Sequence, residues 1–336
     1  MQEKTSAGMP LQRIALAVIS LLAGCNDYHG IPLAGTNEVR THTVLTEDQV
    51  GQVYTLAADG VTLDLGGHAL TAPDGHYAVN IRASNVTVTN GRMTGGADAG
   101  GVRIATCLNK ARLAQHNADP MVSGFIRSAC RQGNTVSNID FTGLGTHVYA
   151  EAFTGRNLIT GNTFSGSDES SIYLDFEGWG NTITDNRFER CGWSDDGRNR
   201  ECIAIDGNAG NLISGNTFTE HQRKRAFPSY WLGKNWPVSA IGLYRNCGEP
   251  ELGMEAQRRQ GADNNSIEGN TFMGGSSGII FAMRTPSGRN FDADHCPLQI
   301  PDRAENNIER GNTFVDVQRP VLDYGKTNQS EYRDGH

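Results

Sequence analysis

The chain has 336 residues, 20% of them charged, and a formal net charge of −8 with an isoelectric point near 5.6. A chain with this acidic balance is not expected to bind nucleic acid nonspecifically, because its overall field repels phosphate. The length would allow two domains, but a continuous internal repeat predicts one.

Residues 1–25 resemble the export signal of a bacterial lipoprotein. Arg13 precedes a short apolar stretch, and LLAGC ends that stretch at Cys25. The apolar run is too short for a comfortable transmembrane helix, and a signal of this kind is normally removed. The resemblance implies lipid on Cys25. Because Asn26 lacks the Asp that usually retains a lipoprotein at the inner membrane, we expect a lipid-anchored envelope protein, at the outer membrane, facing the periplasm or the cell surface.

The rest of the chain is predicted to form one solenoid with short ends. Residues 26–45 are expected to be a linker and N-terminal cap, residues 46–325 the solenoid, and residues 326–336 a frayed polar tail. The segments VTLDLGGHAL from Val61 and NVTVTNGRMTG from Asn85 alternate apolar and polar residues, as half-buried strands do. They therefore read as early coils.

A variant of N-x-I-x-x-N-x-F then recurs, starting at Asn134, Asn157, Asn181, Asn211, Asn265 and Asn307. The shortest intervals between copies give a coil of about two dozen residues, which is typical of solenoids. The first and last copies are degenerate, with the apolar residue of the last one shifted to Ile308. We expect the repeated Asn residues to line up at a turn and to bond to one another and to backbone, a structural role.

With this repeat, the chain resembles the right-handed parallel β-helix superfamily of pectate lyases, polygalacturonases, alginate epimerases and phage tailspikes, over roughly residues 40 to 325. The resemblance implies an all-β, single-stranded parallel β-helix with polysaccharide lying along one sheet. The motif builds the solenoid and is shared by members with different chemistry, so no catalytic residue is carried over.

A short alternating strand follows most copies of the repeat. Its inward residues are predicted to be Val148, Ala150, Ala152, Ile172, Leu174, Phe176, Ile203, Ile205, Gly207, Ile241, Leu243, Ile279, Phe281 and Met283. All large insertions flank this strand, at about 106–132, 189–201, 219–239, 247–263 and 285–304. Loops on both sides of one sheet would form the walls of a groove, although insertions can also merely decorate a solenoid.

Six cysteines remain after Cys25. An even number in an exported chain suggests disulfides, and six cysteines allow fifteen pairings. The positions of the insertions favour Cys107 with Cys130, Cys191 with Cys202, and Cys247 with Cys296.

The outward register of the same strands carries acids. Glu151, Asp175 and Asp206 fall at equivalent outward positions on successive coils, and Glu177 lies one outward step beyond Asp175. Like charges stacked directly are destabilising, so shared protons, a bound cation or catalysis is predicted. The alternative interpretation is a solvated acidic face.

Residues suited to a sugar surround these acids. Tyr149, Tyr173 and Tyr244 are predicted to point outward on the same strands, with Arg245 beside Tyr244 and Arg284 one coil later. Aromatic rings offer platforms for sugars, and cations pair with carboxylate or sulfate. The segment HQRKRAFPSYWLGKNWP concentrates such residues, namely His221, Arg223, Lys224, Arg225, Tyr230, Trp231, Lys234 and Trp236.

Three functions fit this set. A lyase or C5-epimerase for a uronate-containing anionic polysaccharide could hold Ca²⁺ on Asp175, Glu177 and Asp206. Its base would be Arg245, His221 or Tyr244. A glycoside hydrolase would use two carboxylates on adjacent or next-adjacent coils, and a noncatalytic lipoprotein would only bind glycans. We predict an exported monomer acting by β-elimination or C5-epimerisation, and the other two functions stay open.

Overall fold

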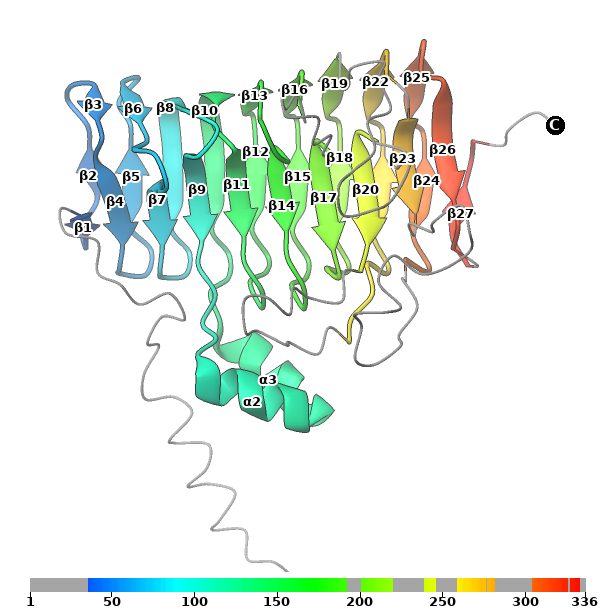
Figure 1. The fold of residues 1–336 in the computed structure, drawn as a ribbon, viewed down its shortest axis with the longest axis horizontal. Coiled ribbons are helices and arrows are strands. Elements are labelled where there is room, and N and C mark those ends of the chain that lie inside the picture. The colour runs from blue at the N-terminus through cyan, green and yellow to red at the C-terminus, as the bar shows by residue number, and fades with distance from the viewer. Residues whose placement is uncertain are drawn as a thin grey trace, which may run out of the picture.

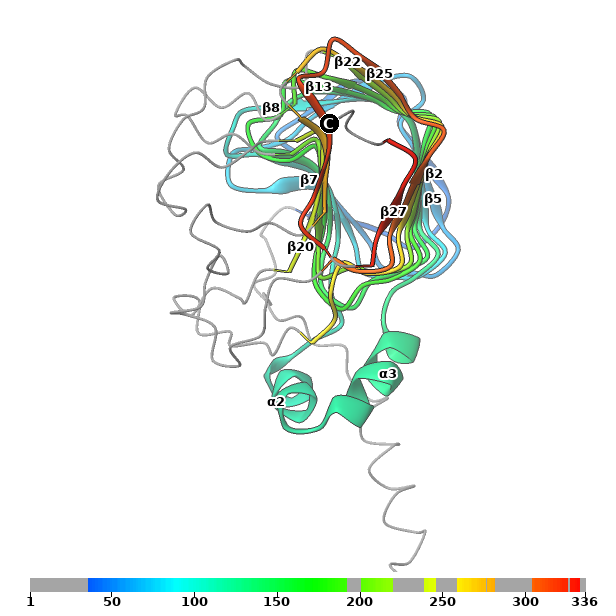
Figure 2. The ribbon, with the colours of Figure 1, turned by 90° about the vertical axis from the view of Figure 1, so that its right-hand side faces the viewer.

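The computed structural model describes residues 36–191, 201–219, 239–245, 259–275, 277–281, 304–325 and 327–332. Within them the chain forms the predicted parallel β-helix, with coils stacked along the long axis of the molecule (Figure 1). Each coil contributes strands to three faces around one core, as the view along the axis shows (Figure 2).

The first face, sheet A, has ten parallel strands among the described residues, and it is the sheet that the insertions flank. Its strands are β1 (Thr36–Val39), β4 (Val53–Leu56), β7 (Tyr77–Ile81), β9 (Gly100–Ile104), β11 (Thr146–Ala150), β14 (Ile172–Leu174), β17 (Ile203–Asp206), β20 (Ile241–Tyr244), β23 (Ser277–Phe281) and β26 (Arg319–Asp323).

The second face is made of β2 (Thr43–Val44), β5 (Thr62–Asp64), β8 (Thr87–Gly95), β10 (Thr135–Gly143), β12 (Leu158–Thr160), β15 (Thr182–Thr184), β18 (Leu212–Ser214), β21 (Ser266–Glu268), β24 (Ile308–Arg310) and β27 (Gln329–Ser330). The long strands β8 and β10 continue into the third face. The third face also contains β3 (Gln49–Val50), β6 (Ala69–Thr71), β13 (Thr163–Ser165), β16 (Arg187–Glu189), β19 (Thr217–Thr219), β22 (Thr271–Met273) and β25 (Thr313–Val315).

The repeat builds two kinds of ladder, as predicted. Side chains of Asn157, Asn181, Asn211 and their equivalents donate to one another from coil to coil at 2.7–3.2 Å. The repeat Phe rings stack at centroid distances of 4.7–5.0 Å, from Phe141 to Phe314. Both ladders need the same residue at the same place in every coil, so the repeat follows from the stacking.

The alternation of sheet A is confirmed within its strands. Inward residues such as Val148, Ile172 and Ile205 are fully buried in the solenoid core. Beyond the strand ends the alternation fails: Ala152, Phe153 and Phe176 belong to a separate apolar cluster outside that core. The predicted inward direction of Ala152 and Phe176 is therefore wrong, because the chain turns directly after β11 and β14.

The solenoid extends further than predicted at both ends. Its first strand begins at Thr36 rather than near residue 46, and its last ends at Ser330 rather than near 325. The last repeat also differs, since Glu309 occupies the core position held by Ile267 one coil earlier. Glu309 is 2% exposed and accepts hydrogen bonds from Asn312, Ser330 and the backbone of Tyr332. The row of apolar core residues thus ends at this coil with a carboxylate whose oxygens are hydrogen-bonded.

The insertion after β9 is a helical hairpin. It consists of α2 (Lys110–Ala118) and α3 (Pro120–Ala129), with Asn109 and Asp119 as the N-caps. In both ribbon views the hairpin lies beside the solenoid, at the edge where sheet A turns toward the face of β2 and β5 (Figures 1 and 2). Neither helix of the described residues is long and apolar enough to cross a membrane.

Two of the three predicted disulfides are confirmed. Cys107 pairs with Cys130 across the base of the helical hairpin, and Cys191 pairs with Cys202. Cys247 and Cys296 lie outside the described residues, as does Cys25.

Candidate functional site

The predicted acidic column exists on the outer side of sheet A. Ala150, Leu174 and Ile205 are register partners on successive strands, so the residues that follow them, Glu151, Asp175 and Asp206, share one register. Asp206 is in turn the partner of Tyr244 on β20. The column is therefore Glu151, Asp175, Asp206 and Tyr244.

Diagonal hydrogen bonds connect this column with its tyrosines. The Tyr149 hydroxyl donates to Asp175 at 2.9 Å, and the Tyr173 hydroxyl donates to Asp206 at 2.7 Å. Each tyrosine thereby bonds to the acid one coil further along the axis. The backbone N–H of Phe176 also donates to Asp175 at 2.8 Å. Each stacked aspartate therefore has hydrogen-bond partners in its buried position.

The acids are buried, whereas the tyrosines are partly exposed. Asp206 is 0% exposed, Glu151 6% and Asp175 7%. Tyr149, Tyr173 and Tyr244 are half-buried. The alternative prediction of a solvated acidic face is therefore wrong, since water reaches little of these carboxylates.

Glu151 differs from the two aspartates because it is neutralised by a residue that sequence reasoning missed. Arg103 on β9 contacts it through Nη2 at 2.6 Å and Nε at 2.7 Å, and the backbone N–H of Thr106 donates to it at 2.7 Å. The register pairs Arg103 with Tyr149. The outward position of Arg103 between Val102 and Ile104 was a signal that could have identified it.

A second missed residue, Tyr77, extends the row of tyrosines. Its ring centroid lies 6.2 Å from that of Tyr149, which lies 5.5 Å from that of Tyr173. The Tyr77 ring passes over Gly100 on β9, where a Cβ atom would lie 2.3 Å from the ring. Gly100 therefore makes room for the aromatic row formed by Tyr77, Tyr149 and Tyr173.

The surroundings keep these phenols protonated. Burial raises the pKa of Tyr149 well above its ordinary value of 10, and the Asp175 and Glu151 carboxylates raise it further. Burial likewise raises the pKa of Tyr77. At neutral pH both phenols are thus hydrogen-bond donors and not bases.

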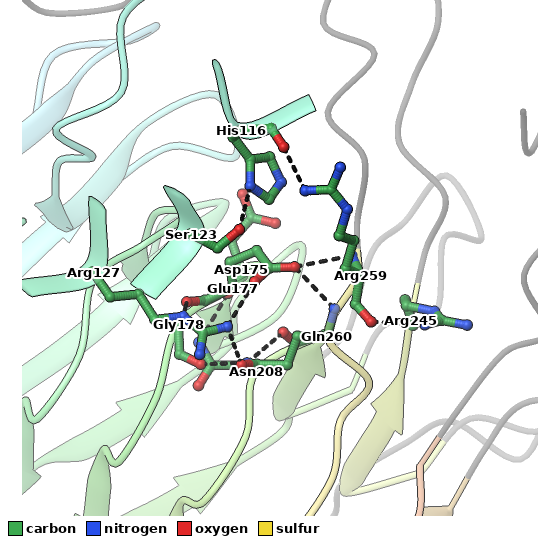
Figure 3. Close-up of polar contacts among 11 residues, drawn as sticks. His116, Ser123, Arg127, Asp175, Glu177, Gly178, Asn208, Arg245, Arg259 and Gln260 are labelled. Carbon is green, nitrogen blue, oxygen red and sulfur yellow. Dashed lines mark hydrogen bonds and ion pairs between the residues drawn. The ribbon is translucent and has the colours of Figure 1, made fainter. Parts of the chain in front are cut away.

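Two of the predicted catalytic residues point away from the column. Glu177 is 2% exposed and accepts from Arg127 and from the backbone N–H groups of Arg259 and Gln260 (Figure 3). Arg245 is 4% exposed and donates to the carbonyl of Arg259 at 3.1 Å. These contacts place both side chains among the residues that attach the helical hairpin.

The described part of the chain has no group of three or more His, Cys, Asp or Glu side chains arranged to hold a metal ion. The prediction that Asp175, Glu177 and Asp206 together bind Ca²⁺ is therefore not supported. The carboxylate of Glu177 is directed to the hairpin, while Asp175 and Asp206 bond to tyrosines.

The remaining predicted site residues lie outside the described residues. They are His221, Arg223, Lys224, Arg225, Tyr230, Trp231, Lys234, Trp236 and Arg284. In the sequence, the basic and aromatic segment 221–237 comes shortly before β20, the strand that brings Tyr244 into the column.

Comparison with known proteins identifies the family and the fold. A family model described as "Periplasmic copper-binding protein (NosD)" matches residues 37–237. No curated protein sequence matches the chain. An alginate lyase structure from Paenibacillus sp. str. FPU-7 is 13% identical, covers 87% of this chain and 92% of its own, and gives a TM-score of 0.45.

Two other solved structures are similarly distant. A tailspike protein of E. coli bacteriophage HK620, in complex with a pentasaccharide, is 11% identical, with 87% of this chain and 53% of the tailspike covered and a TM-score of 0.43. The A-module of a mannuronan C-5 epimerase from Azotobacter vinelandii is 10% identical, with coverages of 94% and 93% and a TM-score of 0.28. Identities this low show a shared fold only.

Proposed function

Because the chain belongs to the NosD family of periplasmic proteins, we propose that it works in the cell envelope, where it binds an anionic polysaccharide along sheet A and hydrolyses it with Asp175 and Asp206. The observation that carries this proposal is the pair of Tyr–Asp hydrogen bonds on successive coils. They hold two carboxylates in one register beneath a row of partly exposed aromatic rings.

The spacing of the carboxylates suits hydrolysis. Neighbouring strands lie about 4.8 Å apart, so acids on adjacent coils match the separation of roughly 5 Å used for retention of configuration. Acids two coils apart, Glu151 and Asp206, approach the roughly 6.5–9.5 Å used for inversion. One carboxyl group would protonate the leaving oxygen. The other would attack the sugar or activate water.

The aromatic row supports binding along the axis. Sugar rings stack on partly exposed aromatic faces, and Tyr77, Tyr149 and Tyr173 present such faces in sequence along the coils. The anionic character of the substrate is inferred from the basic segment 221–237, which could pair with carboxylate or sulfate groups.

A second candidate is β-elimination or C5-epimerisation without calcium. It is favoured by the protonated Tyr149, whose hydroxyl lies 2.9 Å from Asp175 and could pass a proton to a leaving oxygen or a sugar carbon. A carboxylate of the column would first remove the C5 proton, and Tyr149 would then protonate the departing oxygen in β-elimination, or C5 from the opposite face in epimerisation. In a noncatalytic version of the proposal, the buried aspartates only orient the tyrosines for binding.

Copper, which appears in the family description, does not fit the described residues. Copper prefers imidazole and sulfur ligands. The described cysteines are all paired in the two disulfides, His147 lies in the solenoid core, and no three His, Cys, Asp or Glu side chains of the described residues are grouped to hold a metal ion. His116 bonds through Nδ1 to Ser123. We therefore derive no step that involves copper.

We also propose that lipid on Cys25 anchors the protein to a membrane.

Product analysis tests the proposal. Purified protein would be incubated with alginate, polygalacturonate and a neutral α-1,3-glucan. New reducing ends without unsaturated products are expected, and only from the anionic polymers. Absorbance from an unsaturated uronate would instead establish the lyase, and altered sugar composition at constant length the epimerase. Binding with none of these products would leave a glycan-binding protein, and failure to bind any polymer would overturn the proposal.

A further inference from the structure

Glu177 lies where three segments, far apart in the sequence, meet. Its carboxylate accepts from Arg127 Nη2 of α3 at 2.6 Å and from the backbone N–H groups of Arg259 and Gln260, both at 2.9 Å. Arg127 Nε also donates to the Glu177 carbonyl at 3.1 Å. Figure 3 shows these groups converging. One buried side chain thereby connects the helical hairpin, the turn after β14 and the segment that leads into β21.

Arg259 and Gln260 extend these connections on both sides. Gln260 Nε2 donates to the carbonyls of Gly178 at 2.6 Å and Gly207 at 3.0 Å, which belong to successive coils. Arg259 donates to the carbonyls of His116 and Asn117, at the C-terminal end of α2, with Nη2 to Asn117 at 2.8 Å. A cation at this end is favoured by the helix dipole.

Apolar contacts bring the hairpin to the coils but do not fix its direction. Phe153 packs edge-on against both His116 of α2, at 5.0 Å, and Phe176 of the coil, at 6.1 Å. Edge-on ring contacts are weak, whereas a charged hydrogen bond is stronger and has a narrower preferred geometry. With the Cys107–Cys130 disulfide at the base of the hairpin, the polar contacts of Glu177 and Arg259 constrain where the hairpin sits.

We propose that Glu177, Arg127, Arg259 and Gln260 form a clamp that holds the helical hairpin beside the acidic column, which makes Glu177 a positioning residue. Only the part of this inference that concerns the bound glycan rests on the proposed function; the attachment of the hairpin does not. The clamp can act on the site because Glu177 is two residues from Asp175 in the same turn. A shift of this turn would move the Asp175 carboxylate relative to Tyr149 and to a bound sugar.

Hydrogen exchange on the full-length exported protein tests the clamp without any ligand. Glu177→Ala is expected to speed amide exchange in residues 110–129 and near residue 260. Glu268→Ala is the matched control, because Glu268 also pairs with an arginine, Arg310, but on the outer surface of β21. Unchanged exchange in Glu177→Ala would overturn the clamp. Should that variant fail to fold, Arg127→Met removes the same ion pair and leaves the hydrogen bonds from the backbone N–H groups of Arg259 and Gln260 to Glu177 in place.

Kinetics with the anionic polymer turned over fastest in the product analysis tests the positioning role. Glu177→Ala is expected to lower kcat about tenfold with KM nearly unchanged, a smaller loss than that of Asp206→Asn, because Asp175 is displaced and not removed. Glu177→Gln keeps an acceptor and should recover part of that loss. A fall in kcat as large as that of Asp206→Asn, with exchange unchanged, would make Glu177 a catalytic residue and overturn the inference. Faster exchange in a protein that binds no polymer would overturn the proposed function and leave the clamp supported.

Discussion

The Tyr173 hydroxyl donates a 2.7 Å hydrogen bond to Asp206, the acid one coil further along the solenoid. Tyr149 makes the same contact with Asp175 at 2.9 Å. The diagonal is possible because Tyr149 and Tyr173 are register partners, as the acids two residues after them are. The tyrosines and the aspartates of the site are therefore coupled, so a substitution of one should change the energetic effect of substituting the other.

This coupling can be measured at Tyr173. Tyr173→Phe removes a hydrogen bond to a charged group, so the free energy of unfolding should fall by about 1.5–3 kcal/mol. Chemical denaturation checks this value. In a double-mutant cycle with Asp206→Asn, the two effects should not add, because the variants share one contact. Strict additivity would show that the bond contributes nothing.

Substitutions at the adjacent residues Asp206 and Ile205 should affect different properties, catalytic turnover for Asp206 and stability for Ile205. Asp206→Asn keeps the shape of the side chain and should lower turnover by about 10² to 10⁴ while the protein stays folded. Ile205→Ala opens the core and should cost about 2–5 kcal/mol of stability. Activity assays and denaturation curves on both variants check this pair. Full activity of Asp206→Asn would remove Asp206 from the mechanism.

Gly100 should be indispensable to the aromatic row. The Cβ of Gly100→Ala would lie 2.3 Å from the Tyr77 ring, so the ring must move and stability should fall by about 1–3 kcal/mol. Polysaccharide affinity should fall with it. Gly124→Ala in α3 is the control, because its Cβ would meet nothing within 4 Å and the change favours a helix. Equal behaviour of the two variants would contradict the tight packing of Tyr77.

The buried His147 side chain is expected to make the folded protein less stable in mild acid. Burial lowers its pKa from 6.5 to about 4, although the Gly143 carbonyl bonded to Nε2 at 2.8 Å opposes the shift. Because the folded pKa lies below the unfolded value, the folded state binds fewer protons between pH 6.5 and pH 4. The contribution of His147 to stability is thus complete above pH 6.5 and lost as the pH falls toward 4, by about 3 kcal/mol in all.

Denaturation between pH 7 and pH 4 checks the His147 prediction. His147→Leu should flatten the pH dependence over this interval, whereas His42→Gln, at an exposed histidine, should leave it as it is. A slope that survives His147→Leu would assign the acid sensitivity to other groups.

The sequence by itself determined the solenoid and the register of its acidic column. In a parallel β-helix, contacting residues are equivalent positions one coil apart, so periodicity along the chain reports contacts in space. Asn157 above Asn181, Phe164 above Phe188 and Glu151 above Asp175 all follow from this rule.

Only the tertiary structure decided what surrounds that column. The contact of Arg127 with Glu177 and those of Arg259 with α2 join insertions whose lengths follow no period. The reach of Tyr77 over Gly100 toward Tyr149 depends on a side-chain direction that alternation does not give. Glu177 therefore looked like one more outward acid. Its role became visible only when a helical hairpin, packed through Phe153 and Phe176, brought Arg127 to it.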